Sequence, residues 1–110
     1  RSNMKKVDWN TTEYKQLVKA ILALKTGDET ERFLRDLLTE SEIEEFAKRF
    51  LAAEMLSNGA FYSAIEERTG LSSATISRVA KWLKGKGRGY KTVIGRIHHH
   101  NSIQAGRGLS

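Results

Sequence analysis

The chain has 110 residues, of which 39% are hydrophobic, with no proline, no cysteine and a formal net charge of +6. This length suits one domain with tails, and the hydrophobic fraction is enough for a core. Without cysteine there is no disulfide framework and no thiolate metal site, which suits a reducing cytoplasm. No apolar run reaches the length of a membrane span and no secretory signal opens the chain, so we expect no membrane association.

The charge is distributed unevenly along the chain. Residues 1–67 contain all 13 acidic residues and 10 of the 19 Lys and Arg, whereas residues 68–110 contain nine Lys and Arg and no Asp or Glu. A purely cationic half is typical of a surface that binds phosphates. The alternative is a disordered basic tail that only aids solubility. The cations begin inside a patterned helix, which favours the first interpretation.

Apolar spacing predicts two helices in the first part of the chain. The first covers residues 11–25, with Asn10 and Glu13 capping its start and Gly27 ending it. The second covers residues 29–38, with Asp28 as its N-cap. The inward residues of the two helices are Tyr14, Leu17, Val18, Ile21, Leu22, Phe33, Leu34, Leu37 and Leu38.

A longer third helix is predicted from Thr39 to Asn58. Thr39 and Glu42 have the spacing of a capping box, in which each side chain accepts a hydrogen bond from the backbone amide of the other residue. Gly59 ends the helix, since glycine readily adopts the left-handed conformation of a helix end. Its apolar residues at helical spacing are Ile43, Phe46, Ala47, Phe50, Leu51 and Met55.

Two short helices follow, at residues 61–68 and 73–84, and a turn at Gly70 joins them. This arrangement is typical of a helix-turn-helix. Ser72 or Ser73 is predicted to cap the second helix, which leaves its first amides free to approach a phosphate. The residues predicted to hold the two helices together are Ile65, Leu71, Ile76 and Val79.

The outward face of this motif is predicted to bind DNA. Small residues at the start of the second helix allow it to insert into a major groove, where serine can bond base edges and alanine can contact a thymine methyl group. The basic side chains would reach phosphates. An ordinary helical hairpin is the alternative, and the continuous positive charge favours DNA. The predicted DNA-binding residues are Arg68, Ser72, Ser73, Ala74, Thr75, Ser77, Arg78, Lys81 and Lys84.

The two ends are predicted to lie outside the core. Arg1–Asn3, before Met4, resemble residues left by a cloning vector. Residues 85–110 are interpreted as a basic, Gly-rich, mobile tail with at most a short helix over 90–97. No metal site is expected at His98–His100, because no Cys, Asp or Glu is nearby.

From Leu38 to Lys84 the sequence resembles the Trp repressor superfamily, and its branch of Trp-repressor-related proteins of the YerC/YecD type. The features that carry the resemblance are Leu38-Thr39 opening the long helix, Arg49 ten residues later, Gly59 ending that helix, and residues 74–78, Ala-Thr-Ile-Ser-Arg, in the second helix of the motif. The match covers about half of the chain and needs a one-residue deletion between Gly59 and Gly70. It implies an all-α, intertwined homodimer that binds an operator through two helix-turn-helix heads.

The resemblance also implies an effector site. In the tryptophan-dependent repressor the ligand lies between the long helix and the reading helix, and Arg49 and Arg78 match the two arginines that contact it. Leu38 and Thr39 match contacts made by the partner subunit. Two small residues of that pocket are replaced here by Val79 and Trp82. We therefore expect that tryptophan is not a corepressor and that the protein has no cofactor. An interhelical salt bridge is the alternative role for Arg49.

A homodimer also follows from the apolar content, because five helices in about 85 residues carry more apolar surface than a small monomer can bury. Two heads would then lie about 34 Å apart, one turn of DNA. The resulting organisation is a lead-in at 1–10, a dimerisation core at 11–58, the helix-turn-helix at 59–84 and the tail at 85–110.

Taken together, the sequence predicts a DNA-binding transcription regulator, acting as a repressor. An enzyme is not expected, because the only histidines lie in the tail and the acidic residues are spaced as solvated helix pairs. A helical protein–protein adaptor is the main alternative. RNA binding is a further alternative, but an aromatic platform for single strands is missing.

Overall fold

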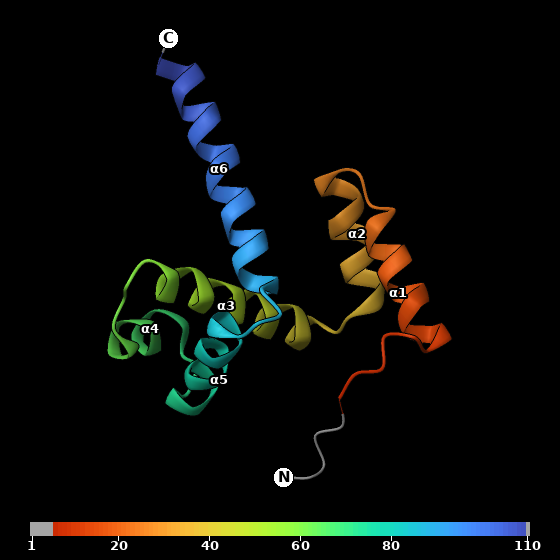
Figure 1. Cartoon of the computed structure of the whole chain (residues 1–110), viewed down its shortest axis with the longest axis horizontal. Coiled ribbons are helices and arrows are strands. Elements are labelled where there is room, and N and C mark those ends of the chain that lie inside the picture. The colour runs from red at the N-terminus through yellow and green to blue at the C-terminus, as the bar shows by residue number, and fades with distance from the viewer. Residues whose placement is uncertain (1–5, 110) are drawn as a thin grey trace. The chain divides into compact units, whose positions relative to one another are not determined.

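The computed structural model describes the backbone of residues 6–109 and the side chains of residues 6–99. All regular structure in this part is helical, as predicted, and the chain forms two compact units, residues 1–40 and 41–110 (Figure 1). The expectation that Arg1–Asn3 derive from a vector concerns residues outside the described part. The helices are α1 (Thr12–Leu22), α2 (Gly27–Leu37), α3 (Glu40–Ser57), α4 (Tyr62–Thr69), α5 (Ser73–Lys84) and α6 (Gly89–Leu109).

The boundary between α1 and α2 differs from the prediction. Helix α1 starts after Thr11 rather than Asn10 and ends at Leu22, so Gly27 does not end it. Gly27 instead opens α2, because Thr26 and not Asp28 is the N-cap. The Glu29 amide donates to Thr26 Oγ1 over 3.1 Å, and the Lys25 amide donates to the Glu29 carboxylate over 2.9 Å. This reciprocal pair stabilises a helix start two residues earlier than predicted.

Among the described residues of the first unit, 6–40, none is buried in a core. No residue of α1 or α2 is buried. The apolar stripe predicted for α1 exists, but it lies open to solvent together with the aromatic residue before it and the end of α2. The exposed large apolar residues of this unit are Val7, Trp9, Tyr14, Leu17, Val18, Ile21, Leu22 and Leu37.

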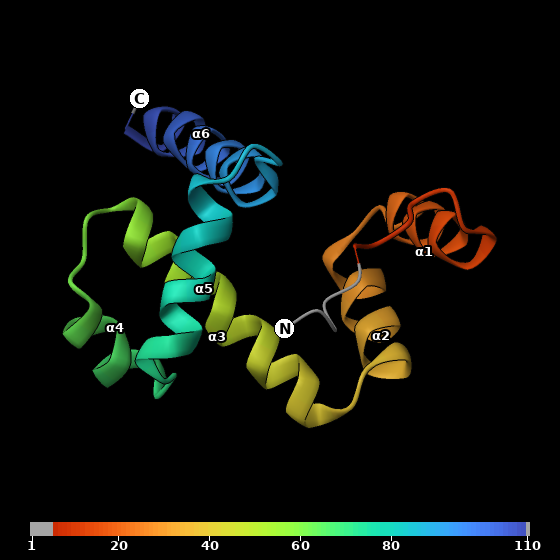
Figure 2. The ribbon, with the colours of Figure 1, turned by 60° about the horizontal axis from the view of Figure 1, so that its bottom comes forward.

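The unit of residues 41–110 contains the hydrophobic core. Ile65 of α4 and Ile76 of α5 are fully buried, and they pack with Ala52 and Ala53 of α3, which are also fully buried. Figure 2 shows α5 lying across α3. Alanine at both core positions of α3 allows this close crossing, since the distance between helix axes depends on the side chains at the contact. The remaining members of the core are Leu71, Val79, Leu83 and Ile94.

Helix α6 is longer than predicted. The sequence indicates at most a short helix over 90–97 within a tail, whereas the backbone is helical from Gly89 to Leu109. Its first turns are anchored to the core: Ile94 is only 4% exposed, and the Tyr90 ring centroid lies 6.4 Å from that of Phe50 in α3. With these anchors in place and no proline in the chain, nothing interrupts the helix.

Gly70 forms the turn between α4 and α5. It is the C-cap of α4 and adopts a left-handed conformation with φ of 76°. A side chain at this position would meet no atom within 4 Å, so the requirement for glycine comes from the backbone alone. The sequence therefore identified this turn correctly.

We predict that Gly70→Ala lowers the free energy of unfolding by about 1 kcal/mol, because an L-residue is disfavoured in the left-handed region. Gly87→Ala is the matched control, since Gly87 has open space around it and no positive φ. Urea unfolding at fixed protein concentration measures both. Equal effects of the two substitutions would contradict this account of the turn.

Candidate nucleic-acid interface

The turn of the helix-turn-helix is held by a buried threonine. Thr69 is 5% exposed, and its hydroxyl donates to the Ile65 carbonyl over 2.7 Å. The same oxygen accepts from the Leu71 amide over 3.1 Å, across Gly70. One side chain thus links the last turn of α4 to the residue that enters the core beside α5. Sequence reasoning missed this role, although a Thr hydroxyl bonding the carbonyl four residues earlier is a known helix pattern.

The first turn of α5 is closed by Ser72. Its Oγ accepts a hydrogen bond from the Thr75 amide and donates to Thr75 Oγ1, both over 3.1 Å. The predicted alternative of Ser72 or Ser73 as cap is therefore decided in favour of Ser72. The hydroxyls of Ser72 and Thr75 bond each other in this cap. The other exposed hydroxyls in the first half of α5 are those of Ser73 and Ser77.

All of the predicted DNA-binding residues are exposed except Thr75, which is half-buried. We call them together the predicted DNA-binding surface. Ser73, Ala74 and Ser77 present small side chains on the N-terminal half of α5. Basic side chains occupy the C-terminal half and the end of α4. Within residues 6–99, all ion pairs lie in α2 and α3. The cations of α4 and α5 therefore form no ion pair with an acidic side chain of the described residues. These cations are Arg68, Arg78, Lys81 and Lys84.

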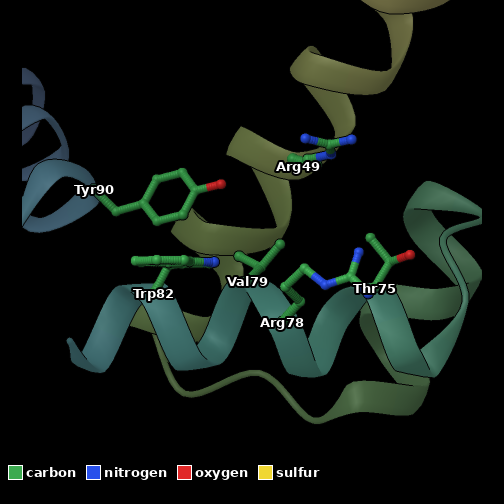
Figure 3. A pocket seen from close by; sticks show the side chains of 6 residues that line it. All are labelled: Arg49, Thr75, Arg78, Val79, Trp82 and Tyr90. Atoms are coloured by element: carbon green, nitrogen blue, oxygen red, sulfur yellow. The ribbon is translucent and has the colours of Figure 1, made fainter. Parts of the chain in front are cut away.

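A small pocket lies behind this surface, with a volume of about 90 Å³. Figure 3 shows its two ends: Tyr90 and Trp82 lie at one, and the arginines lie toward the other. Both Arg49 of α3 and Arg78 of α5 line it, as the resemblance implies. Tyr90 of α6 also lines it, which the sequence did not indicate because α6 was not expected to pack here. The full lining is Arg49, Thr75, Arg78, Val79, Trp82 and Tyr90.

The two arginines of the pocket differ in their partners. The Nε of Arg49 lies 3.2 Å from Glu45 Oε2, and its guanidinium lies 5.5 Å from the centroid of the Phe46 ring. The salt bridge expected as an alternative therefore exists, but within α3 rather than between helices. Arg78 has no acidic partner among the described side chains. Of the two, Arg78 is the one with an unpaired charge to offer an anion.

The substitutions that the sequence singled out shape this pocket in different ways. Val79 is 3% exposed and belongs to the core, so its side chain forms part of the wall. Trp82 is 58% exposed and lines the pocket without filling it. The remaining volume of about 90 Å³ is smaller than the roughly 150 Å³ of an engineered cavity that binds benzene. An indole is larger than benzene, so the space between these six side chains is small for a tryptophan ring.

Leu38 and Thr39 do not line this pocket. They are the last residues before α3 and belong to the unit of residues 1–40, whereas all six lining residues come from residues 41–110. Among the described residues there is also no group of three His, Cys, Asp or Glu that could hold a metal ion. In the same part of the chain, no helix is long and apolar enough to cross a membrane.

These features define an all-helical protein that has a helix-turn-helix, in which Ser72 caps the second helix, and a pocket lined by Arg49 and Arg78. Residues 12–98 match the family model described as "Trp repressor protein". The chain is 42% identical over 85 residues to the uncharacterized protein YerC of Bacillus subtilis (strain 168), covering 77% of this chain and 82% of YerC. The chain therefore belongs to the Trp repressor family, a family of regulators and not of enzymes.

Two solved structures have the same fold. A TrpR-like protein from Eubacterium eligens ATCC 27750 is 41% identical, with a TM-score of 0.77 over 82% of this chain and 93% of that one. A candidate Trp repressor from Staphylococcus aureus is 31% identical, with a TM-score of 0.77 over 84% of this chain and 96% of that one. The predicted resemblance and the Trp repressor-like fold are thus confirmed.

We predict that L-tryptophan does not bind in the micromolar range, because the pocket is too small for its ring. Isothermal titration calorimetry of the protein at pH 7 measures this directly. Saturation at micromolar tryptophan that disappears in the Arg78→Ala variant would show that the pocket opens to accept an indole, and would contradict the prediction.

Proposed function

We propose that this protein is a transcription regulator that binds double-stranded DNA in a sequence-specific manner, as a homodimer. The observation that carries the proposal is the composition of α5 around its serine cap. The end of the helix that would insert into a groove carries only small exposed residues, and unpaired cations follow it. Membership of the Trp repressor family supports the same function.

The face of α5 divides into two chemical parts. Ser73 and Ser77 supply hydroxyls for base edges, and Ala74 supplies a methyl group that fits against thymine. Lys81 and Lys84 lie two to three turns further along, where they would contact phosphates and so add affinity without sequence choice. Arg68, at the end of α4, adds a further phosphate contact in this proposal. Ser72 and Thr75 act through the cap and hold the first turn in place.

The proposed dimer rests on the exposed apolar surface of residues 1–40. Neither α1 nor α2 buries a residue, and Ile21 and Leu22 are 54% and 77% exposed. Exposed apolar surface of this extent marks an interface in a soluble protein. We propose residues 11–58 as the dimerisation core and residues 59–84 as the DNA-binding head.

We further propose that the regulator acts as a repressor in the bacterial cytoplasm and that an anion smaller than tryptophan is its effector. The ligand would lie in the pocket at Arg78, whose charge has no acidic partner there, beside Arg49. Leu38 and Thr39 of the partner subunit would complete the site. The small volume of the pocket supports the exclusion of an indole ring.

For DNA binding, we predict that substitutions of two exposed residues of α5 have different effects. Ser77→Ala should reduce sequence preference, measured as the enrichment of bound sites from a random-sequence pool, because it removes a hydrogen bond to a base edge. Lys81→Gln should weaken binding to every sequence and reduce the salt slope by about 0.9, since one phosphate contact is lost.

If both variants bind as the unmodified protein does, the reading helix has been assigned wrongly. If the unmodified protein binds no duplex at all, the protein–protein adaptor becomes the better interpretation. Both outcomes are visible in the same anisotropy titration with a labelled duplex.

For the dimer, we predict a sedimenting mass about twice the 12.4 kDa of the chain at low micromolar concentration. Leu22→Asp should shift the protein to the monomer, because it places a charge in the apolar stripe. Gln16→Asp is the matched control: it adds the same charge on α1 outside the stripe and should leave the mass unchanged. A monomeric unmodified protein would contradict the proposal.

A further inference from the structure

The end of α5, the connection to α6 and the first turn of α6 carry a second exposed group of cations. We call this segment, residues 84–91, the basic linker. It contains Lys84, Lys86, Arg88 and Lys91, all exposed, with glycine between the first three. No Asp or Glu occurs from residue 68 to the end of the chain, so the linker has no acidic neighbour in sequence.

The linker is held at both ends. Leu83, immediately before it, is 8% exposed, and Ile94, shortly after it, is 4% exposed, so both side chains are in the core. Within the linker, Arg88 adopts a left-handed conformation with φ of 60° and leads directly into α6. Figure 1 shows this connection as a short turn between the two helices. The cations are therefore presented from a fixed turn rather than from a free tail.

The linker lies too far along α5 to read bases. Lys84 follows Ser73 by 11 residues, which corresponds to about 16 Å along a helix axis. The major groove is only about 8.5 Å deep. In a pose in which α5 enters the groove end-on, with Ser73 first, Lys86 and Arg88 therefore lie beyond its edge. Any DNA contact of the linker must be with phosphates outside the base pairs that α5 reads.

A second copy of this chain is a weaker candidate partner. Residues 1–40 contain seven Asp and Glu and eight Lys and Arg, so they carry no net negative charge that would attract the linker. On α3, Glu44 and Glu45 are already paired with Lys48 and Arg49, at 3.0 and 3.2 Å. Unpaired cations in a fixed turn are matched best by a polyanion from outside the protein.

We infer that the basic linker is a second DNA-binding element, which contacts the phosphodiester backbone outside the site read by α5. This inference rests on the proposed DNA-binding function and adds a surface to it. The phosphates belong either to the flanks of the same duplex or to a second duplex. Lys86, Arg88 and Lys91 are the residues that make the contact.

The test is the salt dependence of binding to a labelled 40-base-pair duplex of mixed sequence. The variant K86Q/R88Q/K91Q should lower the slope of log affinity against log salt by about 2 to 3, because each lost phosphate contact removes about 0.9. The control K15Q/K19Q/R35Q changes the net charge equally on exposed residues of α1 and α2, and should leave the slope unchanged.

Two further arms identify the source of the phosphates. If the effect is seen with the 40-base-pair duplex and is absent with a 16-base-pair duplex, the linker contacts the flanks of the same DNA. If the unmodified protein on an immobilised duplex captures a second, labelled duplex and the variant does not, the linker holds a second DNA. Either result supports the inference.

An unchanged slope in K86Q/R88Q/K91Q overturns the inference. If the sedimenting mass of the DNA-free variant changes as well, the linker belongs to a subunit contact instead. If Lys81→Gln weakens binding while K86Q/R88Q/K91Q leaves the slope unchanged, the proposed function stands and the inference fails. If the linker variant alone weakens binding, α5 is not the reading helix and the linker is not a second element beside it, so the inference is overturned together with the assignment of α5. Absence of duplex binding by the unmodified protein overturns both.

Discussion

The packing of Ile65 with Ile76 is the contact on which the rest of the helix-turn-helix unit depends. Both side chains are fully excluded from solvent, and they fix the angle at which α5 leaves the turn. Burial of one such side chain contributes about 1.5–3 kcal/mol. Around this contact, Ala52 and Ala53 let α3 approach, and Thr69 satisfies the buried polar groups at the turn. The outer face of α5 takes no part in this core, so its exposed residues are not constrained by packing.

The two units of the chain differ in how far they bury their apolar residues. Residues 41–110 bury a core of large and small apolar side chains, whereas α1 and α2 leave their apolar stripe exposed. The charged residues are divided in a related way. All Asp and Glu precede residue 68, so the charged residues of α5 and of the chain after it are all Lys or Arg, apart from the histidines. An apolar surface suited to a second subunit and a cationic surface suited to phosphate therefore lie on different segments and do not compete.

Much of this architecture could be predicted from sequence, because its signals are local. Gly59 and Gly70 end helices where left-handed backbone is needed, and the inward positions of α4 and α5 follow from apolar spacing. The start of α2 was misplaced because Thr26 and Asp28 are both good N-caps, and only the hydrogen bond to Glu29 distinguishes them. The packing of Tyr90 into the pocket could not be predicted, because it depends on α6 folding back onto α3 and α5, a contact that leaves no periodic pattern in a glycine-rich stretch.

Thr75 has a consequence for how this protein can change in evolution. Its hydroxyl completes the cap of the reading helix, and its side chain also lines the pocket beside Arg78. One side chain therefore belongs to both the start of the DNA-reading element and the space behind it. A substitution that reshapes the pocket at this position also alters the first turn of α5. Descendants of this protein can therefore reshape the pocket without disturbing the start of α5 only through the other walls of the pocket.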